Sequence, residues 1–215
     1  MNIGILGTGN VGRAIGSHLI QRKHKVKLGS RTTNNEKAIR WTKENGSHAS
    51  HGTFSDAASF GEIIFNCTLG MSSLEALRQA GKSHLDGKIL VDVSNPLDFS
   101  KGMPPSLSVC NTDSLGERIQ QAFPELKVVK TLNTMNSKIM VNPSMIKGKH
   151  CVFVSGNDES AKRIVKDMLK ADFDWKEIID LGDISTCRGT EMLLPLWLRV
   201  NDKLGSAEFN FSIVH

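Results

Sequence analysis

A glycine-rich turn between an apolar run and an amphipathic segment constrains this chain more than any other feature. Residues 3–6 read Ile-Gly-Ile-Leu, and residues 7–12 read Gly-Thr-Gly-Asn-Val-Gly, which matches the pattern G-x-G-x-x-G. Val11, Ile15 and Leu19 recur at helical spacing, so the turn should lead from a strand into a helix that packs on a sheet. Strand, glycine turn and helix in this order are typical of a dinucleotide-binding βαβ unit.

Each glycine of the motif has its own physical reason. Gly7 permits the tight turn, Gly9 lets the backbone approach a pyrophosphate closely, and Gly12 allows the helix to pack against the strand. The unpaired N–H groups at the start of the helix attract phosphate groups. We therefore expect the cofactor to contact Gly7, Thr8, Gly9, Asn10, Val11 and Gly12.

The end of the second predicted strand indicates which dinucleotide binds. An NAD-binding protein usually carries an acid there, which accepts hydrogen bonds from the ribose 2′-OH. This chain instead has Ser30 and Arg31, with Lys37 further along and no acidic residue before Glu36. A guanidinium matches the geometry of a phosphate, and hydroxyl groups add donors. The sequence predicts NADP as the cofactor; a solvated basic loop is the alternative.

Strand and helix patterns alternate as far as about residue 155, which predicts an α/β fold: a Rossmann-like, doubly wound, mostly parallel sheet. We expect one NADP-binding domain over residues 1–215, with a core over 1–155 and a helical and strand extension over 156–215. The predicted strands are 2–6, 25–28, 62–68, 88–93, 127–132 and 151–155, with a weak one near 47–50. The predicted helices are 10–21, 35–44, 72–80, 114–122 and 159–169, and Ser114 with Glu117 forms a capping-box pattern.

The C-terminal extension should contain a further strand over 175–179 and a helix over 190–204. The helical segment is apolar nearly all round, so we expect it to be buried on several sides. Pro195 should mark an early turn or a kink in it. The segment either closes the core or forms a subunit interface, and we expect a homodimer.

Composition restricts the class of protein further. The net charge is +5, and no run of five or more basic residues occurs, so a nucleic acid is not the expected partner. The four cysteines form no C-x-x-C pair, which argues against a zinc or redox motif and fits a reducing cytosol. No signal peptide and no apolar stretch approaching ~18 residues is present. We therefore expect a cytoplasmic protein without a membrane anchor.

No familiar catalytic constellation is present. The chain has no tyrosine, which excludes a Tyr-x-x-x-Lys dehydrogenase, and it has no H-E-x-x-H or G-x-S-x-G motif. The seven histidines have no obvious orienting acid, and His48 with His51 lacks the further ligands that a metal site needs. We assign no catalytic residue and no metal, and we expect hydride transfer to an acceptor that needs little acid–base help.

Four segments should line the crevice at the carboxyl ends of the strands, where open α/β sheets bind ligands. Polar or small residues follow each predicted strand there, and Asn95 before Pro96 should be held extended. The asparagines serve either ligand contact or turn chemistry. The segments are residues 8–11, 68–71, 93–96 and 132–136.

The chain resembles a known family along essentially its whole length. The opening Ile5-Leu6-Gly7-Thr8-Gly9-Asn10-Val11-Gly12 and Leu28-Gly29-Ser30-Arg31 are similar to the NADP-dependent oxidoreductases of the coenzyme F420 (8-hydroxy-5-deazaflavin) reductase family, as are residues 91–97 and 129–134. The cytosolic domains of membrane ferric reductases have a similar opening. The resemblance implies a flavin-like or deazaflavin acceptor, a pyrophosphate at residues 8–11 and a 2′-phosphate at Ser30 and Arg31. It also implies that Lys37 contacts the cofactor, and that Leu69, Asn95, Leu132 and Asn133 lie near the nicotinamide.

Two other functions remain open at this point. A reductase of a small imine or keto acid would need a proton donor in the crevice, for which Lys130 and Lys138 are the nearby candidates. A redox sensor would bind NADP without turnover and would lack a second pocket over the nicotinamide.

Overall fold

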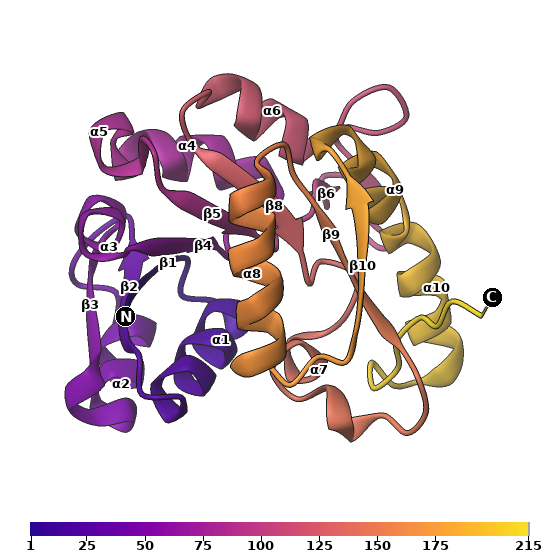
Figure 1. Cartoon of the computed structure of the whole chain (residues 1–215), viewed down its shortest axis with the longest axis horizontal. Coiled ribbons are helices and arrows are strands. Elements are labelled where there is room, and N and C mark those ends of the chain that lie inside the picture. The colour runs from indigo at the N-terminus through magenta and orange to yellow at the C-terminus, as the bar shows by residue number, and fades with distance from the viewer. Residues whose placement is uncertain (215) are drawn as a thin grey trace.

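An eight-stranded sheet forms the centre of the molecule in the computed structural model, which describes residues 1–214 (Figure 1). Its strands are β1 (Asn2–Leu6), β2 (Lys25–Ser30), β3 (Ala49–Thr53), β4 (Ile63–Asn66), β5 (Ile89–Asp92), β8 (Lys127–Thr131), β9 (Cys151–Ser155) and β10 (Glu177–Gly182). The strand order is β10-β9-β8-β5-β4-β1-β2-β3. The chain therefore starts inside the sheet, runs to one edge and returns to build the other, so the order reverses between β1 and β4 as in a doubly wound fold.

The predicted strands all exist; β1 and β9 have the predicted bounds, and the other boundaries shift by at most three residues. The strands β1, β2, β3, β4, β5 and β8 are parallel to one another, whereas β9 pairs antiparallel with β8 and β10 pairs parallel with β9. The mostly parallel sheet is thus confirmed. The strand predicted over 175–179 begins two residues later, at Glu177; Trp175 before it is buried, and its Nε1 donates a hydrogen bond to Met140 O at 3.1 Å.

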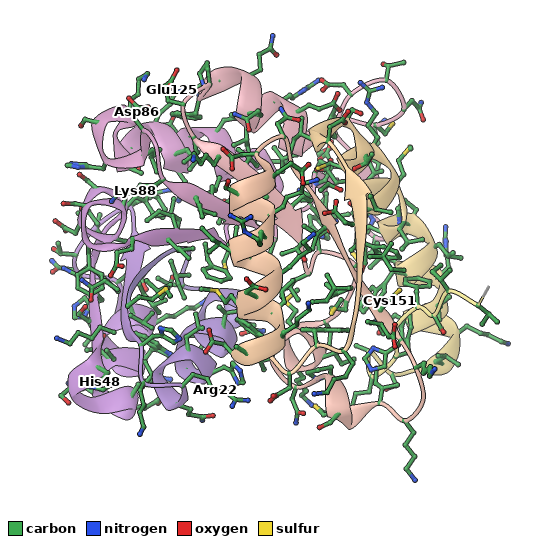
Figure 2. The ribbon with its side chains drawn as sticks, viewed as in Figure 1. Arg22, His48, Asp86, Lys88, Glu125 and Cys151 are labelled. Carbon is green, nitrogen blue, oxygen red and sulfur yellow. The ribbon has the colours of Figure 1, made fainter. Side chains whose placement is uncertain are left out.

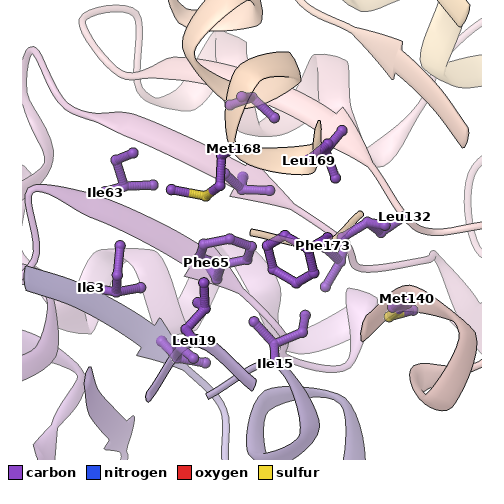
Figure 3. Close-up of a cluster of buried hydrophobic side chains, with 14 of the residues drawn as sticks. Ile3, Ile15, Leu19, Ile63, Phe65, Leu132, Met140, Met168, Leu169 and Phe173 are labelled. Atoms are coloured by element: carbon purple, nitrogen blue, oxygen red, sulfur yellow. The ribbon is translucent and has the colours of Figure 1, made fainter. Parts of the chain in front are cut away.

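Helices cover both faces of the sheet. The helices on these faces include α1 (Asn10–Gln21), α2 (Glu36–Asn45), α3 (Phe54–Phe60), α4 (Gly70–Ala80), α6 (Leu115–Ala122) and α8 (Glu159–Ala171). One face carries α1, α2 and α8 over a core that includes Ile15, Phe65 and Phe173 (Figure 3). The other carries α3, α4 and α6 over a second core. Alternate strand residues supply the two cores: Phe65 belongs to the first and Ile64 to the second.

Several short elements were not predicted. They are α3, α5 (Lys82–Leu85), α7 (Ser137–Val141) and an antiparallel hairpin of β6 (Leu97–Asp98) and β7 (Ser106–Leu107). The seven-residue helix α3 begins with a capping box between Thr53 and Asp56, a pattern visible in the sequence. Lys88, labelled in Figure 2, donates hydrogen bonds to the carbonyl oxygens of Ala58 and Gly61, both 2.7 Å away, and so ties the end of α3 to the start of β5.

The C-terminal helix differs from the prediction in two ways. The segment over 190–204 divides into α9 (Cys187–Met192) and α10 (Leu194–Leu204), with Pro195 in the first turn of α10, so the expected break is confirmed. The prediction that this helical segment is buried on several sides is wrong for the single chain. Leu194 is the only buried residue of α10, while the side chains of Leu196 and Leu204 are 52% and 59% exposed. The helix lies at the edge of the molecule beside β10 (Figure 1).

Residues 1–214 contain no helix that is both long and apolar enough to cross a membrane. Within the same residues, no group of three or more His, Cys, Asp or Glu side chains is arranged to hold a metal ion.

Candidate functional site

A cavity of about 770 Å³ opens at the carboxyl ends of β1, β2 and β4. Its walls come from the glycine turn at residues 7–11, from residues 30–32 at the end of β2, and from residues 67–72 at the start of α4. This is the switch point of the sheet, where open α/β folds bind their ligands. The volume lies within the usual range for a small-molecule or cofactor site.

The glycine turn has the geometry that the motif predicts. Gly7 has φ +115°, and its N–H donates to Gly29 O at 2.9 Å, which joins the turn to β2. A Cβ on Gly12 would lie 2.4 Å from Gly7 O, so a side chain there would force the helix away from the strand. A Cβ on Gly9 would meet no atom of the chain within 4 Å, so this residue leaves an open approach to the backbone. The helix α1 has no side-chain cap and no acid in its first turn, which leaves its N–H groups facing the cavity.

Ser30 and Arg31 line the same cavity, as predicted. Arg31 is exposed and makes no hydrogen bond or ion pair with the residues that the structure describes. Ser30 is buried, and its hydroxyl donates to Thr32 O at 2.6 Å. Asn35 also lines the cavity and caps α2 by accepting from Ala38 N at 3.1 Å, a site residue that sequence reasoning missed. Lys37 is exposed on α2 and is not among the residues lining the cavity.

An apolar rim borders the cavity at the start of α4. Leu69 and Met71 both line it, with exposed fractions of 70% and 61%. Large apolar side chains are unusual at such exposure when they have no partner, and grouped ones mark binding surfaces. Gly70 between them is required, because a Cβ there would lie 2.0 Å from Asn95 O at the end of β5.

The other two predicted crevice segments do not line the cavity but support its wall. Asn133 Nδ2 donates to Asn95 Oδ1 at 3.0 Å, and Asn95 Nδ2 donates to Asn133 O at 2.8 Å. This pair joins the residues that follow β5 and β8. Leu132 and Asn133 are only 1% and 2% exposed. Asn136 caps α7 by accepting a hydrogen bond from Lys138 N at 2.7 Å. Of the two predicted roles, ligand contact or turn chemistry, this asparagine therefore has the second.

A buried polar network lies behind this wall. Asp92 accepts hydrogen bonds from Asn66 Nδ2 at 2.9 Å and from Ser94 Oγ at 2.7 Å. Asn66 in turn accepts from the Thr68 hydroxyl at 2.7 Å, and Thr68 lines the cavity. Lys130 Nζ completes the network, since it lies 2.7 Å from Asp92 Oδ2 and donates to Ser94 O at 2.8 Å. The network therefore connects the interior of the sheet to the loop before α4.

The C-terminal extension closes the same network. Glu191 on α9 lies 2.7 Å from Lys130 Nζ and accepts from Leu115 N and Gly116 N, the first N–H groups of α6. Burial by itself lowers the pKa of Lys130, but Asp92 and Glu191 more than compensate, and the pKa lies above its usual value. Lys130 is thus a buried cation held between two carboxylates. From the sequence, Lys130 is recognisable only as a candidate proton donor, because its partners are remote in the chain.

The described histidines stay outside the cavity. One expectation about them is wrong: His24 does have an acidic partner, because its Nε2 lies 3.1 Å from Asp172 Oδ1. These two residues lie 148 positions apart, which explains why the sequence did not reveal the pair. Cys67 lines the cavity, and burial raises the pKa of its thiol, so it is held neutral. Glu75 on α4 is the only carboxylate among the described lining residues.

Comparison with known proteins identifies a matching family and several similar proteins. Residues 2–96 match the family described as NADP oxidoreductase, coenzyme F420-dependent. The chain is 29% identical over 216 residues to the F420-dependent NADP reductase of Methanocaldococcus jannaschii, covering 96% of this chain and 95% of that protein. It is also 29% identical to the rat metalloreductase STEAP3 over 203 residues, which are 91% of this chain and 37% of that protein.

Solved structures extend the likeness to the whole fold. A crystal structure described as a candidate F420-dependent NADP reductase from Arthrobacter sp. FB24 superposes with a TM-score of 0.94 at 49% identity, covering 99% of both chains. An imine reductase from Bacillus cereus superposes with a TM-score of 0.67 at 13% identity, covering 95% of this chain and 62% of that one. The second likeness concerns the fold alone.

Proposed function

This chain belongs to the coenzyme F420-dependent NADP oxidoreductase family, and we propose that it transfers a hydride between NADP and a deazaflavin of the F420 type. The observation that carries the proposal is the cavity that joins an open glycine turn to an unpaired arginine and an apolar rim. The names of the relatives support the same pair of redox partners.

The cavity fits NADP on the evidence of its own residues. The open approach over Gly9 and the uncapped start of α1 suit a pyrophosphate. Arg31, with a free guanidinium immediately after the buried end of β2, suits a 2′-phosphate. The Ser30 hydroxyl already donates within the turn, so the backbone around Ser30 would complete the site for the 2′-phosphate. We retain Lys37 only as a residue that could approach the 2′-phosphate from outside the cavity.

The nicotinamide end lies on the side of α4 and the ends of β5 and β8. Leu69 and Met71 offer an apolar wall for a planar ring. Asn95 and Leu132–Asn133 hold that wall in place through the amide pair and through the close contact of Asn95 with Gly70. When bound, NADP supplies or accepts the hydride. The chain contributes position and exclusion of water, which together can account for ~7–11 kcal/mol of a barrier.

The reading as an imine or keto-acid reductase gains no support from the lysines that it requires. Lys130 is 1% exposed and held by two carboxylates and a carbonyl. Lys138 is exposed and pairs with Glu208 at 3.2 Å, away from the lining of the cavity. The other alternative, a sensor that binds NADP without turnover, is distinguished from the proposed enzyme by the following experiment.

The test is to mix the purified protein with NADPH and to follow NADPH loss with F420, FMN and a ferric chelate as separate acceptors. We expect rapid loss with F420 and slow loss with the other two. Tight NADPH binding without turnover of any acceptor would indicate the sensor. Tight binding with turnover of FMN or ferric iron alone would overturn the choice of acceptor.

The proposal extends to the assembly. We propose a homodimer in which the exposed apolar side chains of α9 and α10 form the contact, because Met192, Leu196 and Leu204 are each more than a third exposed. We also treat residues 1–215 as one functional domain, since β9 and β10 extend the same sheet that carries the glycine turn. The protein would then act on small molecules, without a nucleic-acid partner.

A further inference from the structure

We propose that Glu75 selects the base of the bound dinucleotide by accepting a hydrogen bond from the exocyclic amine of adenine. The inference rests on the proposed function, because it takes Arg31 as the residue that marks the 2′-phosphate. It assigns a role to the end of the cavity that neither the glycine motif nor the apolar rim explains.

The position of the base follows from covalent connectivity. The 2′-phosphate and the base are attached to the same ribose, so a base must lie close to Arg31. The same cavity is also lined by Glu75, Ala76 and Gln79 on α4. Gln79 lies eight residues beyond Met71, which is about 12 Å along the helix. The helix α4 therefore borders the cavity from the apolar rim at its start to this second, polar group of residues.

Two buried apolar side chains line the cavity together with these polar residues. Phe54 at the start of α3 and Ala76 on α4 belong to the same buried cluster and both line the cavity. They are 7% and 3% exposed, so they offer apolar surface that is held in place by the core. A purine needs apolar surface against its faces and polar partners at its edge. Glu75 and Gln79, one helical turn apart, provide the polar edge.

The charge of Glu75 makes its position informative. A carboxylate repels the phosphates of NADP, so its presence in the lining is unfavourable unless it accepts a hydrogen bond from the ligand. The adenine amine is a neutral donor on the part of the ligand that this end of the cavity would receive. A hypoxanthine ring presents a carbonyl oxygen at the same place, which the carboxylate would repel.

The carboxylate is already oriented by its own helix. Gln79 Nε2 donates to Glu75 Oε1 at 2.9 Å, and Arg78 Nη1 approaches Glu75 Oε2 at 3.7 Å. One oxygen is thus held by a good hydrogen bond, and the other has only a long, solvent-exposed ion pair. The second oxygen remains able to accept from a ligand.

The test compares the dissociation constants of NADPH and of its hypoxanthine analogue, in which a carbonyl replaces the adenine amine, by fluorescence titration or calorimetry. A hydrogen bond to a charged group that is partly open to water should make NADPH bind about five- to thirtyfold more tightly than the analogue. In Glu75→Gln this ratio should fall below about threefold, because the amide can donate to the carbonyl. In Glu75→Ala the ratio should also fall, but the analogue should gain no hydrogen bond from the protein.

Glu44→Gln is the matched control, since it removes a carboxylate that is also exposed on a helix, α2, but does not line the cavity. It should leave the ratio unchanged, and thermal melting should show that all variants are folded. A ratio near one in the wild type, or a ratio unaffected by Glu75→Gln, would overturn the inference while NADPH still binds. Failure of the wild type to bind either dinucleotide would instead count against the proposed function.

Discussion

Lys130 Nζ and Asp92 Oδ2 lie 2.7 Å apart with both side chains at most 1% exposed. The pair joins β5 to β8 directly beneath the wall of the cavity. Glu191 from α9 also contacts Lys130, so the C-terminal extension and the nucleotide-binding half share one buried charge cluster. Because these charges have no access to water, each depends on the others for its solvation.

We expect Lys130→Met to destabilise the protein by about 3–5 kcal/mol, because it leaves two buried carboxylates without their cation. The measurement is urea unfolding followed by circular dichroism. Lys138→Met is the control, since Lys138 is 66% exposed and should change stability by less than about 0.5 kcal/mol. Equal, small effects of the two substitutions would show that the cluster does not carry the charges described.

Arg31→Ala should weaken NADPH binding about ten- to a hundredfold and leave NADH binding almost unchanged. The reason is that a charge-assisted hydrogen bond to a phosphate contributes roughly 1.5–3 kcal/mol, and NADH lacks that phosphate. Titration of each dinucleotide by fluorescence provides the measurement. Equal losses for both would indicate that Arg31 supports the fold of the loop instead of reading the phosphate.

The apolar rim should matter more for turnover than any histidine. Met71→Ala widens the wall proposed for the rings, whereas each single replacement of His18, His24, His48, His51, His84 or His150 should leave the rate within about tenfold. A general acid would cost 10²–10⁴-fold instead. The measurement is kcat with NADPH and F420. A histidine variant that binds NADPH normally but loses a thousandfold in rate would point to the imine or keto-acid reading.

A charged residue at the proposed dimer contact should give a soluble monomer. Leu196 is the better position, because it is 52% exposed, whereas Trp197 stacks on Phe209 at 5.2 Å and supports the C-terminal segment. We therefore expect Leu196→Lys to halve the mass observed by sedimentation and to leave the melting of the monomer cooperative. A wild type that already sediments as a monomer at micromolar concentration would refute the contact.

The ion pair between α6 and α9 should contribute stability that depends on pH. Arg188 donates two hydrogen bonds to Glu117, at 2.6 and 2.9 Å, and these bonds lower the pKa of Glu117. A carboxylate whose pKa is lowered by folding stabilises the fold at pH values above its pKa in the unfolded chain, about 4.3. This stabilisation is lost as the pH falls through the pKa of the carboxylate in the folded protein.

Glu117→Gln should therefore cost up to about 1 kcal/mol at pH 7, and this cost should shrink steadily below about pH 4.3. Urea unfolding of both proteins across this range measures it. Glu208→Gln removes a more exposed partner, 51% accessible, and should have little effect at any pH. A cost of Glu117→Gln that stays constant down to acid pH would exclude the ion pair as its source.

The sequence by itself determined the parts of this protein that depend on neighbouring residues. The glycine turn, the start of α1 and the exchange of an acid for Ser30 and Arg31 all lie within thirty-one residues, and their local chemistry admits few arrangements. The apolar strands of the large sheet were equally predictable, because continuous apolar runs suit a sheet covered on both faces, whereas β3 gave only a weak signal and β6 and β7 gave none.

The tertiary structure alone decided which distant side chains meet. Glu191 reaches the start of α6 from 75 and 76 positions away, and Asn95 meets Asn133 across 38 positions. No periodicity encodes such pairs, since they arise from the order in which strands enter the sheet. Likewise, the apolar composition of α10 could not reveal that one side of this helix remains exposed. The position of Glu75 in the lining of the cavity depends on the packing of α4 against α3, which the sequence does not show.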